Sequence, residues 1–292
     1  MIDRKKKGVW MSEKASSDSD VRIVACADQA EVAMRAARDV ENVIVSIQEG
    51  REGASNTTGV TPDGYARLVV TGGSTGIAVL HQLYIDSEAG NAGIDWHRVH
   101  VFFGDERWVP ADHPERNDKQ AAEALFSNID IPQENLHRFL APSSDSAYGE
   151  TEGSHNGNVD VAELKDAAAS YADAINTYAP DGFDIHLLGM GPEGHINSLF
   201  PHTPGLTSED TVVSVTDCPK PPPTRLSLSR RALNSSTRVW FVVAGEAKAE
   251  ALWHAVSGDD ADMWPAAGAR GQEDTVVYAD APALSQLQGS SS

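Results

Sequence analysis

Short apolar runs alternate with helix-like segments along most of this 292-residue chain. In several runs the apolar residues follow one another without regular polar interruption, as in ARLVV (66–70) and RVWFVVA (238–244). A strand that is apolar on both sides has to be covered on both faces, as the strands of parallel sheets are. Strands that alternate with helices build such sheets. The pattern therefore predicts an α/β fold: a Rossmann-like, mostly parallel sheet with helices on both faces.

The same pattern locates the individual elements. Asp28 and Glu31 have the spacing of a capping box before an amphipathic helix whose apolar positions continue to Ile47. Strands are expected at 21–26, 66–70, 98–103, 137–140, 183–188, 211–215, 238–244 and 275–280. Further helices are expected at 76–84, just after 117, at 160–178 and at 246–256.

The chain is expected to form one α/β domain over residues 21–285. Residues 1–20 are polar and charged without periodicity, which predicts a disordered leader in which Met11 is an alternative start to Met1. The segment 143–160 is acidic and poor in apolar residues, so we expect a mobile surface insertion there. Residues 286–292 are expected to form a tail.

The charge and composition restrict the partners. Acidic residues (43) outnumber basic ones (23), and the net charge of −20 argues against nucleic acid and anionic membranes but not against a small anionic substrate. No apolar run approaches the roughly 20 residues that span a bilayer, and no signal peptide is evident, so a cytoplasmic location is expected. Cys26 and Cys218 lack zinc or disulfide spacing and are interpreted as core residues. We expect a monomer or weak homodimer without metal or cofactor.

Ligands of open α/β sheets bind at the carboxyl ends of the strands. This rule selects four segments: 71–76, 104–118, 189–201 and 244–248. In the first, Gly72, Gly73, Ser74 and Thr75 lie between a strand and a helix, where backbone N–H groups, a helix N-terminus and two hydroxyls can hold an anion. The alternative is a tight glycine turn with a capped helix. The lysine of a nucleoside triphosphate loop is absent.

Charged residues follow two other strands. Asp105 and Arg107 come directly after an apolar strand, and the planar guanidinium of Arg107 fits a phosphate or a carboxylate. Lys248 lies in the first turn of an expected helix, where its charge opposes the helix dipole unless an anion compensates it. A solvated loop and a plain surface lysine are the structural alternatives. Arg225 and Arg270 are weaker candidates of the same kind.

The segment GMGPEGHINSLFP (189–201) contains a GxGxxG pattern after a strand. A dinucleotide fingerprint opens a long helix in a first βα unit, whereas this loop lies late in the chain and Pro192 and Pro201 interrupt any helix. We therefore interpret the glycines as a sharp turn that exposes His195, a candidate general base. No metal-binding spacing accompanies it. Ser198 lacks the GxSxG elbow of a nucleophile and is expected to make a loop hydrogen bond.

Taken in order, five segments resemble the motifs of the 6-phosphogluconolactonases: TGGST, FFGDERWVP, LGMGPEGHINSLFP, KPPPTRLSLS and GEAKAEAL. The resemblance extends over residues 22–282 and implies the fold that this family shares with the glucosamine-6-phosphate deaminases and isomerases. Two positions depart from the family pattern. Glu193 stands where Asp is more frequent, so its carboxylate is carried on a side chain one methylene longer. Asn197 stands where Ala is more frequent, which is expected to leave the chemistry unchanged.

The resemblance implies hydrolysis of 6-phospho-D-glucono-1,5-lactone to 6-phospho-D-gluconate, the second step of the oxidative pentose phosphate pathway. It implies that His195 activates a water molecule and that Asp105 or Glu193 orients the water or the imidazole. The substrate phosphate would lie on the cradle at 72–75. Three cations would assist that cradle: Arg107, Arg225 and Lys248.

Three alternatives differ from this hypothesis in identifiable residues. A glucosamine-6-phosphate deaminase carries a Glu where this chain has Phe200, and a phenyl ring transfers no protons. A non-catalytic sugar-phosphate sensor of the same fold would carry a DNA-binding domain, for which the leader at 1–20 is too short. The third alternative, an NAD-dependent enzyme, is supported only by the GxGxxG pattern.

Overall fold

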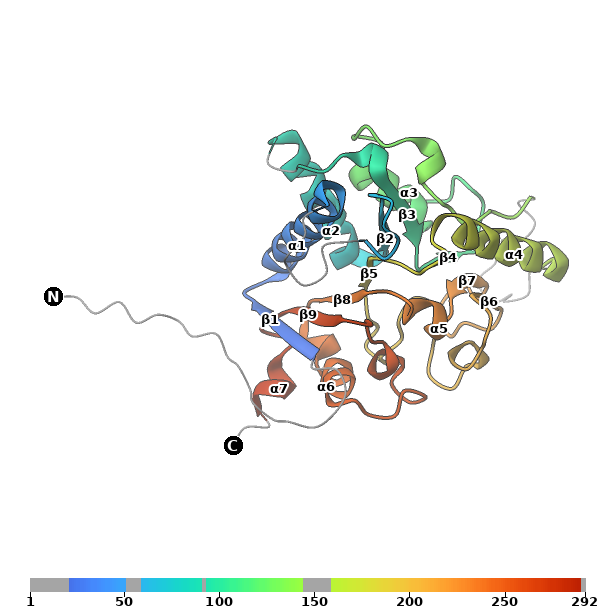
Figure 1. The fold of residues 1–292 in the computed structure, drawn as a ribbon. Coiled ribbons are helices and arrows are strands. Elements are labelled where there is room, and N and C mark those ends of the chain that lie inside the picture. The colour runs from blue at the N-terminus through green and yellow to red at the C-terminus, as the bar shows by residue number, and fades with distance from the viewer. Residues whose placement is uncertain (1–20, 51–58, 91–92, 144–158, 290–292) are drawn as a thin grey trace.

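The structure is a computed structural model that describes residues 21–50, 59–90, 93–143 and 159–289. Six parallel strands form the central sheet, and helices lie on both of its faces (Figure 1). This arrangement confirms the predicted fold class. The expected leader, most of the expected insertion at 143–160 and residues 290–292 of the expected tail lie outside the described residues.

The order of strands in the central sheet places a ligand site at its middle. The order is β1-β9-β8-β5-β2-β3. From β2 the chain proceeds outward to β3, then returns to β5 and continues in the opposite direction through β8 and β9, so progress reverses between β2 and β5. Ligand crevices form beyond the carboxyl ends of the strands at such a point. The strands are β1 Val21–Cys26, β2 Ala66–Val70, β3 Val99–Phe103, β5 Ile185–Leu188, β8 Arg238–Val243 and β9 Asp274–Asp280.

Helices α1 and α2 lie together on one face of the sheet, and α6 and α7 lie together on the other (Figure 1). Helix α1 starts at the expected cap, because Asp28 accepts from the N–H of Glu31 (2.9 Å). The side chain of Glu31 accepts from the N–H of Ala27 (2.6 Å), one residue before the donor of a standard capping box. Helix α7 occupies the start of the expected tail. The helices are α1 Gln29–Glu49, α2 Gly73–Glu88, α3 Asn117–Ala121, α4 Val161–Tyr178, α5 Arg230–Leu233, α6 Ala249–Ser257 and α7 Ser285–Gly289.

Successive residues of β8 contribute to the two halves of the core. Trp240 and Val242 pack in the cluster that contains the buried faces of α1 and α2. Phe241 and Val243 pack in the cluster that contains Leu252 of α6. Because side chains alternate across a strand, a continuous apolar run fills both halves, which explains the unbroken hydrophobicity of the segment.

Three short strands form a second, antiparallel sheet in the order β4-β7-β6: Asp105–Arg107, Arg225–Leu228 and Val212–Val215. The sequence predicts a strand at 211–215 but not its place outside the parallel sheet. It also predicts a loop at 105–107, where the chain instead pairs with β7. These departures depend on pairings between distant segments, which local hydrophobicity does not encode.

The prediction of a strand at 137–140 is wrong. One bridge joins Val101 to Leu136, and the N–H of His137 donates to the carbonyl of Val101 (2.9 Å). The chain then leaves the sheet, and the ring of Phe139 stacks on Tyr171 with centroids 3.6 Å apart. Packing against α4 therefore replaces strand pairing in this segment.

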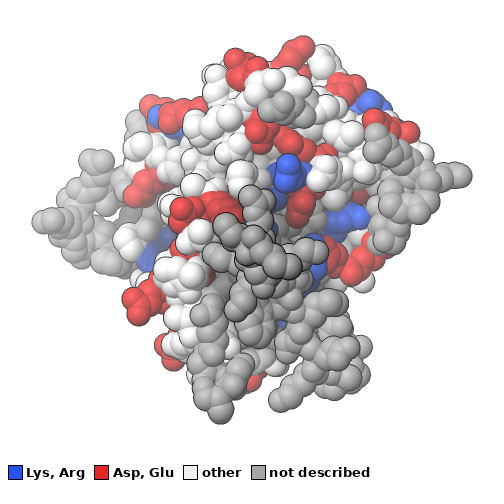
Figure 2. Space-filling model, turned by 90° about the vertical axis from the view of Figure 1, so that its left-hand side faces the viewer, with Lys and Arg blue, Asp and Glu red and all other residues white. Residues whose placement is uncertain are grey.

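The surface carries the acidic excess of the composition. On the face in Figure 2, acidic side chains are spread widely and basic ones are interspersed with them. None of the helices in the described ranges is long and apolar enough to cross a membrane.

The hydroxyl of Tyr171 on α4 completes the hydrogen bonding of the edge strand β3. It accepts from the N–H of Phe103 (2.7 Å), and it lies within donating distance of the carbonyls of Phe103 (3.1 Å) and His137 (3.3 Å). Tyr171 is buried, so water does not replace these contacts. The hydroxyl therefore links α4 to the end of the strand that leads into Asp105.

We expect Tyr171→Phe to lower the free energy of unfolding by about 1–3 kcal/mol, because it leaves the buried N–H of Phe103 without an acceptor. Urea denaturation measures the change. Tyr178→Phe on the same helix is the control, since Tyr178 is 39% exposed and its change is expected to be negligible. An equal loss in both variants would contradict the role of the Tyr171 hydroxyl.

Candidate functional site

The four segments selected from the sequence meet around one cavity of about 230 Å³ at the carboxyl ends of β2, β3, β5 and β8. Every predicted site residue except Glu193 lines this cavity, and Glu193 lies directly behind it against His195. The residues concerned are Gly72, Gly73, Ser74, Thr75, Asp105, Arg107, His195, Arg225 and Lys248. Arg270 does not line the cavity, because its guanidinium donates to the carbonyls of Ala269 and Ala255.

The anion cradle forms at the N-terminus of α2. Gly72 caps the helix without a side-chain hydrogen bond, so the first backbone N–H groups stay available to a ligand. Only glycine fits at this position, since a Cβ there would lie 2.0 Å from Oδ1 of Asn117. The hydroxyls of Ser74 and Thr75 both face Nε2 of Gln29, at 3.2 and 3.0 Å. Because they accept from this amide, their own protons remain available to an anion.

Asn117 joins two of the predicted site residues. Its Nδ2 donates to the carbonyl of Asp105 (2.9 Å) and to Oδ1 of Asp105 (3.2 Å), and its Oδ1 accepts from Nη1 of Arg107. Oδ2 of Asp105 accepts from the hydroxyl of Ser198 (2.6 Å), which is the loop hydrogen bond expected for Ser198. In the sequence Asn117 marks only the start of an expected helix, whereas its side chain fixes the orientation of the Asp105 carboxylate.

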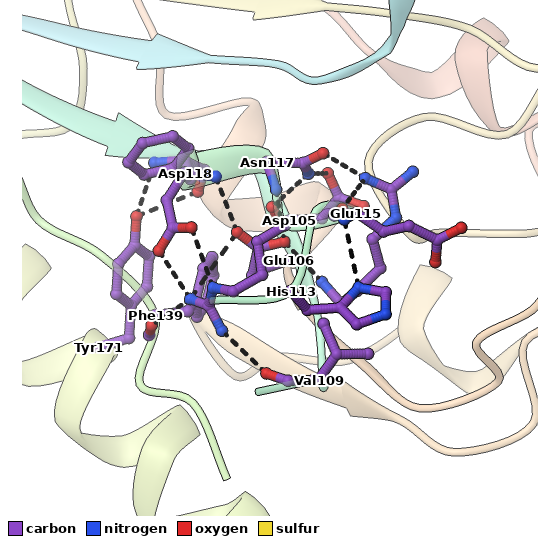
Figure 3. A network of polar contacts seen from close by, with 12 residues as sticks. Asp105, Glu106, Val109, His113, Glu115, Asn117, Asp118, Phe139 and Tyr171 are labelled. Carbon is purple, nitrogen blue, oxygen red and sulfur yellow. Dashed lines mark hydrogen bonds and ion pairs between the residues drawn. The ribbon is translucent and has the colours of Figure 1, made fainter. Parts of the chain in front are cut away.

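The carboxylate of Glu106 belongs to a network of polar contacts next to Asp105 and Asn117 (Figure 3). It accepts from the backbone N–H groups of Arg107 (2.8 Å), Asn117 (2.8 Å) and Asp118 (3.0 Å). Buried Arg116 lies 3.8 Å from it and pairs with Asp118 at 2.8 Å. Burial raises the pKa of Glu106 to about 7, and the charge of Arg116 opposes that rise. The network fixes β4 against the start of α3.

The loop after β5 presents the imidazole of His195 to the cavity. The ring stacks on Phe200 with centroids 4.3 Å apart, and its Nδ1 lies 3.2 Å from Oε1 of Glu193. Nε2 is thus the nitrogen left for a ligand. Gly191 allows the close approach, since a Cβ there would lie 1.9 Å from Nδ1. The loop continues in turns and one bridge without opening a helix, which does not support the dinucleotide alternative.

Lys220 is a site residue that the sequence analysis missed. Its Nζ lies 2.7 Å from Oε1 of Glu193 and 3.5 Å from Nδ1 of His195. Burial alone would raise the pKa of Glu193, but the hydrogen bonds from His195 and Lys220 hold it well below its usual value. Burial lowers the pKa of His195, and Glu193 partly offsets that effect. The KPPPT run at 220–224 was the available signal, but Lys220 is 27 positions from Glu193 along the chain, so spacing alone did not indicate the contact.

The basic side chains of the cavity lack acidic partners. Arg107 and Arg225 lie directly opposite each other in the β4–β7 pair, where like charges repel. Nε and Nη2 of Arg225 donate to the carbonyls of the proline run that follows Lys220 and to that of Lys220 itself. Among the described residues no carboxylate forms an ion pair with Arg107, Arg225 or Lys248. Burial and then Lys220 lower the pKa of Lys248. The arrangement favours a bound anion.

Within the part of the chain that the structure describes, no group of three or more His, Cys, Asp or Glu side chains is placed to hold a metal ion. The site therefore combines an anion cradle, a cluster of cations and a histidine–carboxylate pair.

Comparisons with known proteins agree with the motifs. Residues 27–278 match the sequence model of the family described as glucosamine-6-phosphate isomerases/6-phosphogluconolactonase. The 6-phosphogluconolactonase of Mycobacterium tuberculosis is 44% identical over 229 residues, which cover 78% of this chain and 87% of that protein. The 6-phosphogluconolactonase of Streptomyces coelicolor is 40% identical over 232 residues, or 77% of this chain and 83% of that protein.

Solved structures show the same fold. The 6-phosphogluconolactonase of Thermotoga maritima superposes with a TM-score of 0.69 at 25% identity, covering 89% of this chain and all of that one. A monomeric glucosamine-6-phosphate deaminase superposes with a TM-score of 0.67 at 21% identity, covering 91% of this chain and 99% of that one. The second likeness concerns the fold alone and confirms the predicted relation to the deaminase fold.

The unpaired cations predict that inorganic phosphate binds and raises the melting temperature. We expect Lys248→Ala and Arg107→Ala each to weaken phosphate binding by about 10-fold, in the range of one charged hydrogen bond. Titration calorimetry measures the effect. Exposed Lys165 on α4 supplies the control variant Lys165→Ala. Unchanged affinity in both cavity variants would remove these side chains from the anion site.

Proposed function

This chain belongs to the glucosamine-6-phosphate isomerase/6-phosphogluconolactonase family, and we propose that it hydrolyses 6-phospho-D-glucono-1,5-lactone to 6-phospho-D-gluconate. The observation that carries the proposal is the imidazole of His195, held by Glu193 at the wall of a cavity that also contains the anion cradle. This reaction is the second step of the oxidative pentose phosphate pathway. We place it in the cytoplasm, with the enzyme a monomer or weak homodimer.

The substrate phosphate is proposed to bind at the N-terminus of α2. The backbone at Gly72 and Gly73 and the hydroxyls of Ser74 and Thr75 supply donors there. Three cations would complete the clamp: Arg107, Arg225 and Lys248. Arg225 has a second role in this scheme, since its donors to the proline run also hold Lys220 beside Glu193.

His195 is proposed to act as the general base. A carboxylate only accepts hydrogen bonds, so Glu193 favours the tautomer with the proton on Nδ1, which leaves the lone pair on Nε2. Nε2 takes a proton from water as the water oxygen attacks the lactone carbonyl carbon. The imidazolium then returns the proton to the ring oxygen as the C–O bond breaks. Glu193 stabilises the imidazolium during this step.

Asp105 is proposed to face the substrate rather than the imidazole. Its carboxylate is held by Asn117 and Ser198, whereas Glu193 is the carboxylate in contact with His195. Asp105 would accept a hydrogen bond from the attacking water or from a substrate hydroxyl. The two carboxylates thus take separate roles, an assignment that the sequence left open.

The deaminase alternative is disfavoured by Phe200. Deaminases of this fold need a proton-transferring carboxylate at this position, whereas the ring of Phe200 is buried and stacks on His195. The stacked ring lowers the polarity around the imidazole, which favours its neutral form. Phe200 thus stands where a deaminase has its proton-transferring carboxylate, and it favours the neutral imidazole that a general base requires.

The purified protein is expected to accelerate the hydrolysis of freshly prepared 6-phosphoglucono-δ-lactone near neutral pH and to leave glucosamine 6-phosphate unchanged. His195→Asn is expected to lower kcat by about 10²–10⁴-fold, the usual contribution of a general base. His202→Asn, with a largely exposed imidazole near the same loop, is the control. Full activity in His195→Asn would refute the base, and an inactive wild-type chain would refute the function.

The pH dependence provides a second test, because neutral His195 is the active form. Burial lowers its pKa, so kcat/KM is expected to fall on acidification only below the ordinary histidine value of about 6.5. Glu193 raises this pKa and Lys220 lowers it. Glu193→Gln should therefore move the acid limb to lower pH, and Lys220→Met should move it to higher pH. Shifts in the same direction would contradict the assigned contacts.

A further inference from the structure

Asn197 lies on the wall of the cavity, two residues after His195. Its backbone φ is 47°, in the left-handed region, where asparagine is more frequent than other residues with a side chain. Its side chain is only 7% exposed and lines the same cavity as His195 and Lys248. A polar side chain is thus held at the ligand edge by an unusual backbone conformation.

The NH₂ group of the Asn197 amide is buried without a partner among the described residues. The amide lies beside the imidazole of His186, whose pKa burial lowers and this side-chain contact raises, but neither Oδ1 nor Nδ2 of Asn197 has a partner at full hydrogen-bonding geometry in the described part of the chain. Both groups approach Gly104, where a Cβ would lie 2.3 Å from Oδ1 of Asn197 and 3.2 Å from Nε2 of His186. The imidazole of His186 can serve only Oδ1, and leaving the NH₂ group of a buried amide unsatisfied is costly, so this group calls for a partner supplied from the cavity.

The protein supplies little to satisfy this amide. Burial lowers the pKa of His186 to about 3, so its imidazole is neutral and has one N–H, and its Nδ1 lies 3.5 Å from the hydroxyl of Ser236. The NH₂ group of Asn197 therefore still needs an acceptor. A phosphate offers only acceptors and already has its cradle at α2, whereas a sugar hydroxyl both accepts and donates, as the amide does.

We propose that Asn197 is a specificity-determining residue whose side-chain amide hydrogen-bonds one ring hydroxyl of the bound lactone. The inference rests on the proposed lactonase function and deepens it. It replaces the expectation that asparagine at this position leaves the chemistry unchanged. The buried amide selects a lactone with a hydroxyl at one position over an analogue without it, because the analogue leaves the amide unpaired.

The test compares Asn197→Gly with the wild-type enzyme on 6-phosphoglucono-δ-lactone and on its 2-deoxy, 3-deoxy and 4-deoxy analogues. Glycine removes the amide and tolerates the positive φ. We expect kcat/KM on the parent lactone to fall by about 10-fold, the scale of one hydrogen bond. One deoxy analogue should be a poorer substrate for the wild type by a similar factor but no poorer for the variant than the parent lactone.

His202→Gly is the matched control, since His202 also has a positive φ, of 59°, and does not line the cavity. This control variant should not discriminate between the parent lactone and its deoxy analogues. If Asn197→Gly fails to fold, Asn197→Asp is the second variant, because it keeps the shape of the side chain but lacks the NH₂ donor. For this variant too, the deoxy analogue that the wild type handles poorly should be no poorer a substrate than the parent lactone. The inference would be overturned, while the lactonase function stands, if the loss from Asn197→Gly simply added to the loss from removing a hydroxyl for every analogue. It would also be overturned if Asn197→Gly caused no loss at all. An inactive wild-type chain would overturn both.

Discussion

All six strands of the central sheet run in the same direction, and the placement of the site depends on this constraint. Parallel strands bring their carboxyl ends to one edge, so the loops after β2, β3, β5 and β8 meet although they are distant in sequence. Parallel strands also need cover on both faces, which the two apolar clusters on either side of β8 provide. The rigid sheet therefore holds together loops that would not meet on their own.

One of these loops needs an additional support. The strand β4 is three residues long and lies outside the central sheet, so its own pairing with β7 gives little stability. The buried carboxylate of Glu106 compensates by binding three backbone N–H groups of β4 and α3, with Arg116 and Asp118 beside it (Figure 3). Asn117, whose backbone N–H binds Glu106, hydrogen-bonds through its side chain to Asp105 and Arg107 and so fixes their positions.

The electrostatics of the cavity differ from those of the chain as a whole. The chain carries a net charge of −20, yet three cations without acidic partners among the described residues line the cavity. Their mutual repulsion favours an anion between them. Next to them, Glu193 and Lys220 act on the imidazole of His195 in opposite directions, so the titration of this histidine depends on two neighbours and on burial.

Sequence by itself determined what depends on local pattern. The apolar runs identified the strands, the capping-box spacing located the start of α1, and the glycines and prolines around His195 showed that its loop opens no helix. The rule that ligands bind at the carboxyl ends of parallel strands then selected the segments that line the cavity. Only the tertiary structure decided which side chains touch. Gln29 meets the hydroxyls of 74–75 and Lys220 meets Glu193, while the NH₂ group of Asn197 meets no partner among the described residues. Each of these arrangements depends on strand order and burial rather than on spacing along the chain. For the same reason the segment 137–140 looks like a strand in the sequence but packs on Tyr171 instead.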